Sequence, residues 1–232
     1  MRTRLALFLI ASCVVLAPAP AEAGKIKGAL WVTGKSAANA RAVATATPET
    51  RTATKRAQLG VTDAVVWVEK VPEAVERKLA DGGPHWFWQH RERPRLLRIV
   101  QRNHAFAPRA LAVVAGSQVE FLNLDRVYHN AFSVSSARRF DFGKYAPGRA
   151  DTVLFEHTGV INLHCDIHPE ELGFIVVVPN HVIARPDSLG AFTLPRLPPG
   201  IYTLRAWHPR LGELKRSFEV PKRGDVRLEL GF

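Results

Sequence analysis

The sequence predicts an all-β fold in which many short strands form a sandwich or a barrel. Three observations lead to this expectation. From Leu96 onward, short apolar or alternating runs of residues follow one another with turn signals between them. A second series of such runs follows Asn180. No segment shows the long periodicity of an amphipathic helix.

The expected strands fall into three groups along the chain. Two strands come first, at residues 25–32 and 64–68, and the second is apolar enough to be buried on both faces. The first regular series comprises 97–101, 110–114, 118–123, 131–134, 152–155, 160–164 and 174–178. The second series comprises 191–194, 201–207, 215–220 and 225–230. Residues 34–60 lack periodicity and are expected to form a loop or a poorly ordered insert.

The first residues have the pattern of an export signal. A basic start precedes an apolar run over 5–16, and Ala21-Glu22-Ala23 matches a signal-peptide cleavage site. We therefore predict a cleaved signal peptide over 1–23 and a periplasmic mature chain. The apolar run is too short to span a membrane, so no transmembrane segment is expected in that chain. Lipoprotein anchoring is an alternative, because residues 10–13 loosely resemble a lipoprotein box.

The chain is basic, with a formal net charge of +11 and a pI of about 10.3. A surface of this kind suits an acidic protein partner, an anionic membrane or nucleic acid. No nucleic-acid-binding motif accompanies the charge, so we expect no nucleic-acid partner. Docking to an acidic protein, or simple solubility, explains the charge better.

The clearest motif is Cys165-Asp166-Ile167-His168-Pro169, preceded by His129. Removal of the signal peptide would take away Cys13 and leave Cys165 alone, so no internal disulfide can form. A buried apolar cysteine is one interpretation. The nearby histidine favours another, since one thiolate and two imidazoles are the in-plane ligands of a blue-copper site.

Such a copper site usually adds a weak axial methionine, and here none is available. The only methionine of the chain is Met1, and Glu171 stands where a short ligand loop would place the axial residue. A carboxylate would favour Cu(II) over Cu(I), and it would also make the set acceptable to zinc. The alternative is that Glu171 faces solvent and the axial position stays empty.

Other polar residues near the motif have less specific patterns. Asn130 follows the first histidine, and its amide could hydrogen-bond across to the Cys165 loop and hold it in place. A second metal site could use His85, His90 and His104, although the cluster at 85–91 is also typical of a solvated basic loop.

Five motifs between Gln101 and Pro179 resemble those of the cupredoxins. They are Asn103-His104-Ala105-Phe106-Ala107-Pro108, Gly116-Ser117-Gln118-Val119-Glu120-Phe121, Tyr128-His129-Asn130, Phe140-Asp141-Phe142-Gly143 and Cys165-Asp166-Ile167-His168-Pro169. The resemblance implies a Greek-key β-sandwich that binds one type 1 copper ion through His129, Cys165 and His168. The spacing of the cysteine loop is similar to the short loop of amicyanin.

The flanking segments resemble a carboxypeptidase-regulatory-like, transthyretin-like β-sandwich. The motifs are Asp63-Ala64-Val65-Val66-Trp67-Val68, Gly190-Ala191-Phe192-Thr193-Leu194 and Leu197-Pro198-Pro199-Gly200. We therefore expect a discontinuous domain over 24–95 and 181–232, with a cupredoxin domain over 96–180 between its parts. The combination resembles exported proteins of the methylamine-utilisation type, although the sequence shows no amine chemistry.

These features together predict an exported copper-binding electron carrier with one modified type 1 site. The alternative is a protein that binds or delivers copper or zinc without electron-transfer turnover. An enzyme is not expected, although Cys165 and His168 could be read as a nucleophile and its base. Pro169 and Leu172 would offer an apolar contact patch. An acidic redox partner could be steered by basic residues, namely Arg138, Arg139, Lys144 and Arg149.

Overall fold

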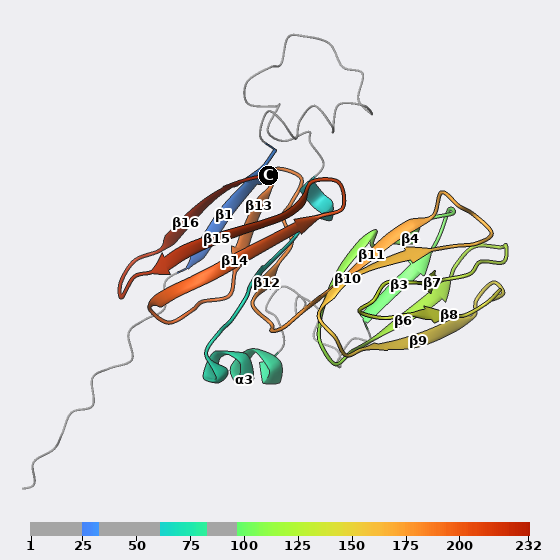
Figure 1. The fold of residues 1–232 in the computed structure, drawn as a ribbon, viewed down its shortest axis with the longest axis horizontal. Helices are drawn as coiled ribbons and strands as arrows, with labels where there is room; N and C mark the ends of the chain where they lie inside the picture. The colour runs from blue at the N-terminus through green and yellow to red at the C-terminus, as the bar shows by residue number, and fades with distance from the viewer. Residues whose placement is uncertain (1–24, 33–60, 83–96) are drawn as a thin grey trace, which may run out of the picture.

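The computed structural model describes residues 25–32, 61–82 and 97–232 (Figure 1). The predicted signal peptide, the 34–60 insert and the aromatic and basic cluster at 85–91 lie outside these residues. The described residues form 16 strands in four sheets, with one α-helix and one short 3-10 helix. The predicted all-β class is confirmed. No helix among the described residues is long and apolar enough to cross a membrane.

The middle of the chain forms one β-sandwich, coloured green to orange in Figure 1. One sheet has the strand order β5-β11-β10-β7-β8, and the other has the order β4-β3-β6-β9. The strands are β3 (Leu97–Gln101), β4 (Phe106–Ala107), β5 (Ala110–Val114), β6 (Ser117–Asn123), β7 (Phe132–Ser133), β8 (Phe140–Asp141), β9 (Ala150–Phe155), β10 (Gly159–His164) and β11 (Leu172–Val178). Fully buried side chains such as Phe121, Phe155 and Leu163 fill the space between the sheets.

A second sandwich combines strands from before residue 70 with strands from after residue 180. Its sheets have the orders β13-β1-β16 and β12-β2-β14-β15. The strands are β1 (Ile26–Trp31), β2 (Val65–Val68), β12 (Ile183–Ala184), β13 (Ala191–Leu194), β14 (Gly200–His208), β15 (Gly212–Val220) and β16 (Val226–Gly231). The resemblance of this sandwich to carboxypeptidase-regulatory-like domains stays a prediction.

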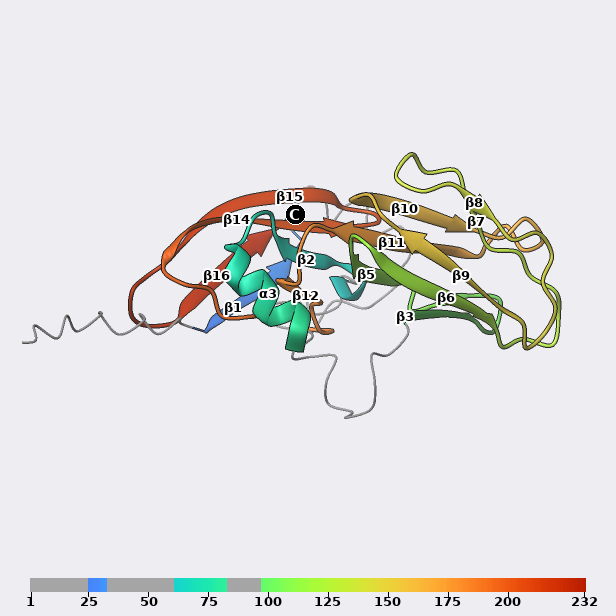
Figure 2. The same ribbon diagram turned by 90° about the horizontal axis from the view of Figure 1, so that it is seen from below.

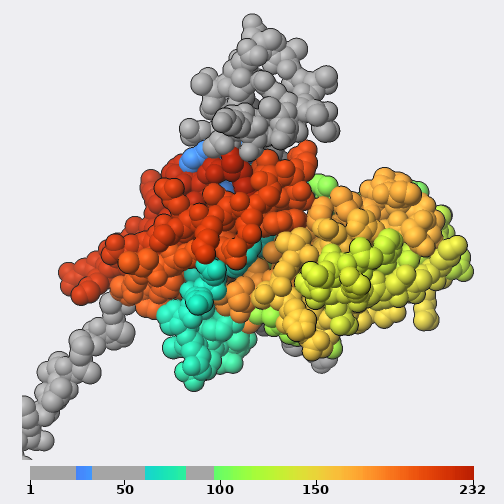
Figure 3. Space-filling view, viewed as in Figure 1, coloured from blue at the N-terminus to red at the C-terminus, as the bar shows by residue number. Residues whose placement is uncertain are grey.

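The two sandwiches meet along β11, and Figures 2 and 3 show them lying end to end. Successive side chains of a strand point to opposite faces. Ile175 and Val177 therefore enter the core of the middle sandwich, while Val176 and Val178 pack against Trp67 and its neighbours in β2 and β12. The ring of Phe174 also contacts Trp207 of β14, so the junction extends to the middle of β11. The N-terminal end of β11, at Leu172, continues instead from the loop that follows β10.

Helix α3 (Glu73–Gly82) was not predicted from the sequence. It is short and mostly exposed, so only a few partly buried apolar residues, such as Val75 and Leu79, mark one side of it. A residue that is distant in the sequence holds the helix in place. Glu76 of α3 accepts hydrogen bonds from the backbone N–H and the ring of His181 at 2.9 and 2.6 Å. The two-residue strands β4, β8 and β12 were also missed, since they are too short to show a pattern.

Candidate metal centre

Three of the predicted site residues lie in the loop that joins β10 to β11. These strands are antiparallel neighbours, and their last pairs at this end are Leu163 with Gly173 and His164 with Leu172. The pairing closes the loop between Cys165 and Glu171 at both ends. Within the loop, the N–H of Glu171 donates to the carbonyl of His168 at 3.0 Å, which turns the chain back. Short-range pairing therefore gathers Cys165, His168 and Glu171.

His129 reaches the same place from the segment between β6 and β7. It forms an isolated bridge with Tyr145, in which each backbone N–H donates to the other residue's carbonyl, at 3.2 and 2.8 Å. Pairing of Phe132 with His164 then places this segment beside β10. The backbone N–H of Asn130 donates to Cys165 Sγ at 3.4 Å and closes the arrangement.

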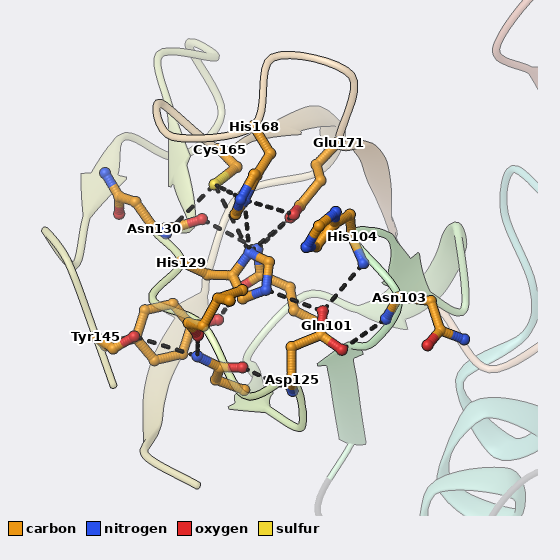
Figure 4. Close-up of polar contacts among 12 residues, drawn as sticks. Gln101, Asn103, His104, Asp125, His129, Asn130, Tyr145, Cys165, His168 and Glu171 are labelled. Atoms are coloured by element: carbon orange, nitrogen blue, oxygen red, sulfur yellow. Dashed lines mark hydrogen bonds and ion pairs between the residues drawn. The ribbon is translucent and has the colours of Figure 1, made fainter. Parts of the chain in front are cut away.

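The four predicted ligand atoms converge on one point, as Figure 4 shows. Cys165 Sγ, the Nδ1 atoms of His129 and His168, and a carboxylate oxygen of Glu171 all lie within 4.8 Å of one another. The sulfur is 4.0 Å from His129 Nδ1 and 3.8 Å from His168 Nδ1, and the two Nδ1 atoms are 3.1 Å apart. Three of the residues are buried, and only the His168 side chain is partly exposed, at 18%.

Glu171 points into this group and is only 1% exposed. The alternative in which it faces solvent is therefore wrong. Its Oε1 lies 2.8 Å from His129 Nδ1 and 3.0 Å from His168 Nδ1, but it has no hydrogen-bond partner. A buried carboxylate oxygen without a donor is costly. A cation held between these atoms would remove that cost.

The imidazole of His129 is oriented by Asp125, whose Oδ2 lies 3.0 Å from Nε2. Burial raises the pKa of Asp125, but hydrogen bonds from the backbone N–H groups of His104 and Asn103 and from His129 outweigh it, so the pKa is lowered. An ionised carboxylate can only accept. The proton of a neutral His129 ring therefore sits on Nε2, and the Nδ1 lone pair faces the centre.

Asp125 is itself held by two unusual backbone conformations. Asn103 and His104 have φ values of 54° and 55°, in the left-handed region that residues other than glycine rarely adopt. Their successive N–H groups donate to the two oxygens of Asp125 at 2.7 and 3.0 Å. Such a pair of N–H groups is a favourable environment for an anion. The strained turn therefore supports an ionised carboxylate beside the centre.

Behind Glu171 lies a buried polar chain that sequence reasoning missed. Gln101 Nε2 donates to Glu171 Oε2 at 2.6 Å and to the carbonyl of Asn130 at 3.1 Å. The hydroxyl of Tyr145 donates to Gln101 Oε1. Burial, followed by the negative charges of Glu171 and Cys165, raises the pKa of Tyr145 above its usual value, so the phenol keeps its proton.

Two predictions about neighbouring residues need correction or refinement. The side-chain amide of Asn130 does not reach the cysteine loop but donates to Asp141 Oδ1 at 2.9 Å, and its oxygen has no partner. The backbone N–H of Asn130 makes the contact with the loop instead. His104 was considered for a second metal site, but its ring stacks on His168 with 4.4 Å between centroids. His85 and His90 lie outside the described residues.

The residues present fit a single copper or zinc ion. Metal–ligand distances of about 2.0–2.3 Å place neighbouring ligand atoms roughly 3–4 Å apart. Five of the separations here run from 2.8 to 4.0 Å, and all lie within 4.8 Å. Thiolate and imidazole suit both metals. A carboxylate is also an accepted zinc ligand. Among the described residues, no other group of three such side chains gathers its ligand atoms in this way.

Comparison with known proteins gives structural neighbours only. No protein-family model matches the chain. No curated protein matches it either. Among solved structures, a copper-containing nitrite reductase from Thermus scotoductus is 26% identical over 37% of this chain, with a TM-score of 0.35. The chain spans only 23% of the length of that reductase.

Two smaller proteins are matched over most of their own length. An amicyanin variant in its Cu(I) form is 21% identical, with 35% of this chain and 81% of amicyanin covered and a TM-score of 0.34. A purple cupredoxin from Nitrosopumilus maritimus is 24% identical, with 35% and 98% covered and a TM-score of 0.32. The strands themselves confirm the predicted all-β class, and the cupredoxin likeness of the middle sandwich stays a prediction. The chemistry of the centre is inferred from its own residues.

Replacing Asp125 by Asn tests the orientation of His129. The amide can donate as well as accept, so it no longer fixes the proton on Nε2. Loss of a partner of this kind lowers metal affinity by about 10–100-fold. We expect that loss for Zn(II), measured by competition with a chelator. Asp166→Asn is the control, because it removes the same charge from an exposed residue next to Cys165. Equal affinities for the two variants would contradict the role of Asp125.

Proposed function

We propose that this chain is an exported copper-binding protein that carries electrons through one modified type 1 site. The observation that carries the proposal is the convergence of a buried cysteine sulfur, two imidazole nitrogens and a buried carboxylate oxygen on a single point. The proposed ligands are His129, Cys165, His168 and Glu171. Export to the periplasm rests on the signal-like residues 1–23.

The protein framework suits electron transfer because it holds the ligands before any ion arrives. The bound copper would supply one-electron chemistry between Cu(I) and Cu(II), and thiolate and imidazole ligands suit both states. The loop from Cys165 to Glu171 is closed by paired strands, and His129 is fixed by its bridge to Tyr145. Ligands that cannot move far keep the structural change on electron transfer small.

His168 is the ligand through which a partner could exchange electrons. Its side chain is partly exposed, whereas that of His129 is fully buried. Beside it, Pro169 is exposed and Leu172 is half-buried. Three further exposed apolar side chains lie in the loop leading to His129, namely Leu124, Val127 and Tyr128. These residues support an apolar contact surface around the exposed ligand.

The proposed partner is an acidic redox protein. Arg139, Lys144 and Arg149 are exposed and Arg138 is half-buried, and these residues follow β7 and precede β9 in the middle sandwich. A basic surface beside a contact patch speeds the encounter with an acidic partner and weakens as salt is added. The resemblance to exported proteins of the methylamine-utilisation type stays a prediction, and it does not identify the redox partner.

Storage or delivery of copper or zinc is the second candidate function. The observation that favours it is the negative charge around the centre, where Glu171 faces the ligand nitrogens and Asp125 holds His129. Carboxylates stabilise a divalent ion more than Cu(I), so they oppose reduction. A reversible one-electron cycle at an accessible potential distinguishes the carrier from a storage protein.

A catalytic role for Cys165 is not proposed. Its side chain is 3% exposed, so a substrate has little access to the sulfur. The sulfur also lies 3.8 Å from His168 Nδ1, and that nitrogen faces Glu171 as well. This arrangement supports a metal ligand better than a nucleophile with its base.

Addition of Cu(II) to the metal-free protein tests the metal-binding proposal directly. We expect an intense thiolate-to-copper absorption band that saturates at one equivalent of Cu(II). Cys165→Ser should abolish the band, because it removes the sulfur. His157→Gln, which changes an exposed histidine outside the group, should leave it intact. A wild-type protein without the band would rule out the type 1 assignment.

Glu171→Met tests the effect of the carboxylate on the copper ion. A thioether removes the negative charge that favours Cu(II), so we expect the reduction potential to rise. A rise of at least about 60 mV corresponds to a tenfold change in a one-electron equilibrium. The measurement is a spectroelectrochemical titration. Glu170→Met is the matched control, since Glu170 is the exposed neighbour with the same charge. Equal shifts in both variants would show that Glu171 does not contact the ion.

A further inference from the structure

Gln101 occupies a fixed position between the two partners of its side chain. It is the last residue of β3, where it pairs with Phe106 of β4 on one side and Asn123 of β6 on the other. Its carbonyl accepts a hydrogen bond from the N–H of Leu124 at 2.9 Å. The residue is 1% exposed. Backbone pairing on both sides therefore sets where its amide can reach.

The direction of each hydrogen bond from this amide follows from its neighbours. The carbonyl of Asn130 can only accept, so the NH₂ group of Gln101 faces this carbonyl and Glu171. The Gln101 oxygen then faces Tyr145 and accepts from its hydroxyl. The two N–H groups then go to Glu171 Oε2 and to the carbonyl of Asn130. Every hydrogen of the amide is used. Rotating it would leave several buried polar groups unpaired, which is costly.

The two oxygens of Glu171 consequently have different roles. Oε2 accepts from Gln101, whereas Oε1 faces the two Nδ1 atoms and has no donor. We propose that Gln101 is a positioning residue that makes Glu171 present one oxygen to a bound divalent ion, and that Tyr145 acts through Gln101. This inference rests on the proposed metal site. It assigns a role to residues that are not themselves ligands.

A single carboxylate oxygen keeps the donor set at four atoms. A carboxylate that binds through both oxygens would add a fifth donor and suits larger ions with oxygen-rich sites. Four donors of mixed sulfur, nitrogen and oxygen type suit zinc and copper. The hydrogen bond from Gln101 also draws charge away from the carboxylate, which weakens it as a ligand. Gln101 thus helps to select the ion and its coordination.

The test compares Gln101→Leu with Gln118→Leu in the full protein. Leucine removes all three side-chain hydrogen bonds of Gln101. Gln118 is an exposed residue of β6. Loss of a partner to a metal ligand lowers affinity by about 10–100-fold. We expect a loss of this size in Zn(II) affinity, by chelator competition, for Gln101→Leu only. The electron paramagnetic resonance spectrum of its Cu(II) form should also change.

Tyr145→Phe tests whether Tyr145 acts through Gln101. It keeps the ring and removes the hydroxyl, so we expect a smaller loss of Zn(II) affinity. The double variant should lose no more than Gln101→Leu alone, because both changes break one chain of hydrogen bonds. Additive losses would contradict the role given to Tyr145. If Gln101→Leu does not fold, an unchanged affinity in Tyr145→Phe overturns the proposal.

The remaining outcomes separate this inference from the proposed function. A lower unfolding free energy in Gln101→Leu with unchanged Zn(II) affinity and Cu(II) spectrum would show a structural role only and overturn the inference. A wild-type protein that binds Zn(II) but gives no copper–thiolate band would end the carrier proposal, while the Zn(II) comparison still decides the role of Gln101. A wild-type protein that binds neither ion overturns both.

Discussion

The centre depends on one physical constraint: four atoms that carry lone pairs face one another in a buried space. Cys165 Sγ, two imidazole nitrogens and Glu171 Oε1 share a region within 4.8 Å, and Oε1 has no donor of its own. Such an arrangement is unfavourable unless protons or a cation lie between the atoms. Asp125 accounts for the proton of His129 and directs it away from the centre. The protein therefore holds a space that a metal ion would stabilise.

The rest of the middle sandwich can be understood as the support for this arrangement. The pairing of β10 with β11 closes the loop that carries three of the four residues, and β11 continues into the junction with the second sandwich. Contacts behind the ligands come from strands far away in sequence, through Gln101 of β3 and Tyr145 before β9. The ligand side chains that have a polar partner are thereby oriented before a metal ion binds. Ligands oriented in this way keep the structural change of the site on electron transfer small.

The fold class and the main residues of the metal centre were predictable from the sequence. Period-two runs predicted the all-β class, and a thiolate three residues before an imidazole, with His129 further upstream, predicted the group that converges. The supporting residues were not predictable in the same way. Gln101 and Asp125 are single polar residues whose role depends on the register of β3 and on a strained turn. The amide of Asn130 was expected to hold the loop, but Asp141 is within its reach and binds it instead. Helix α3 was not predicted because it lacks a clear apolar periodicity. A histidine that is distant in the sequence, His181, holds it instead.

X-ray absorption of the Cu(II)-loaded protein tests the central claim most directly, since it reports the kinds of atom around the ion and their distances. One sulfur, two imidazole nitrogens and one further oxygen around a single copper ion are expected. In Glu171→Gln and Cys165→Ser, the oxygen and the sulfur contributions, respectively, should change while the imidazole contribution remains. A copper ion surrounded only by oxygen and nitrogen atoms in the wild-type protein would contradict the assignment of this centre.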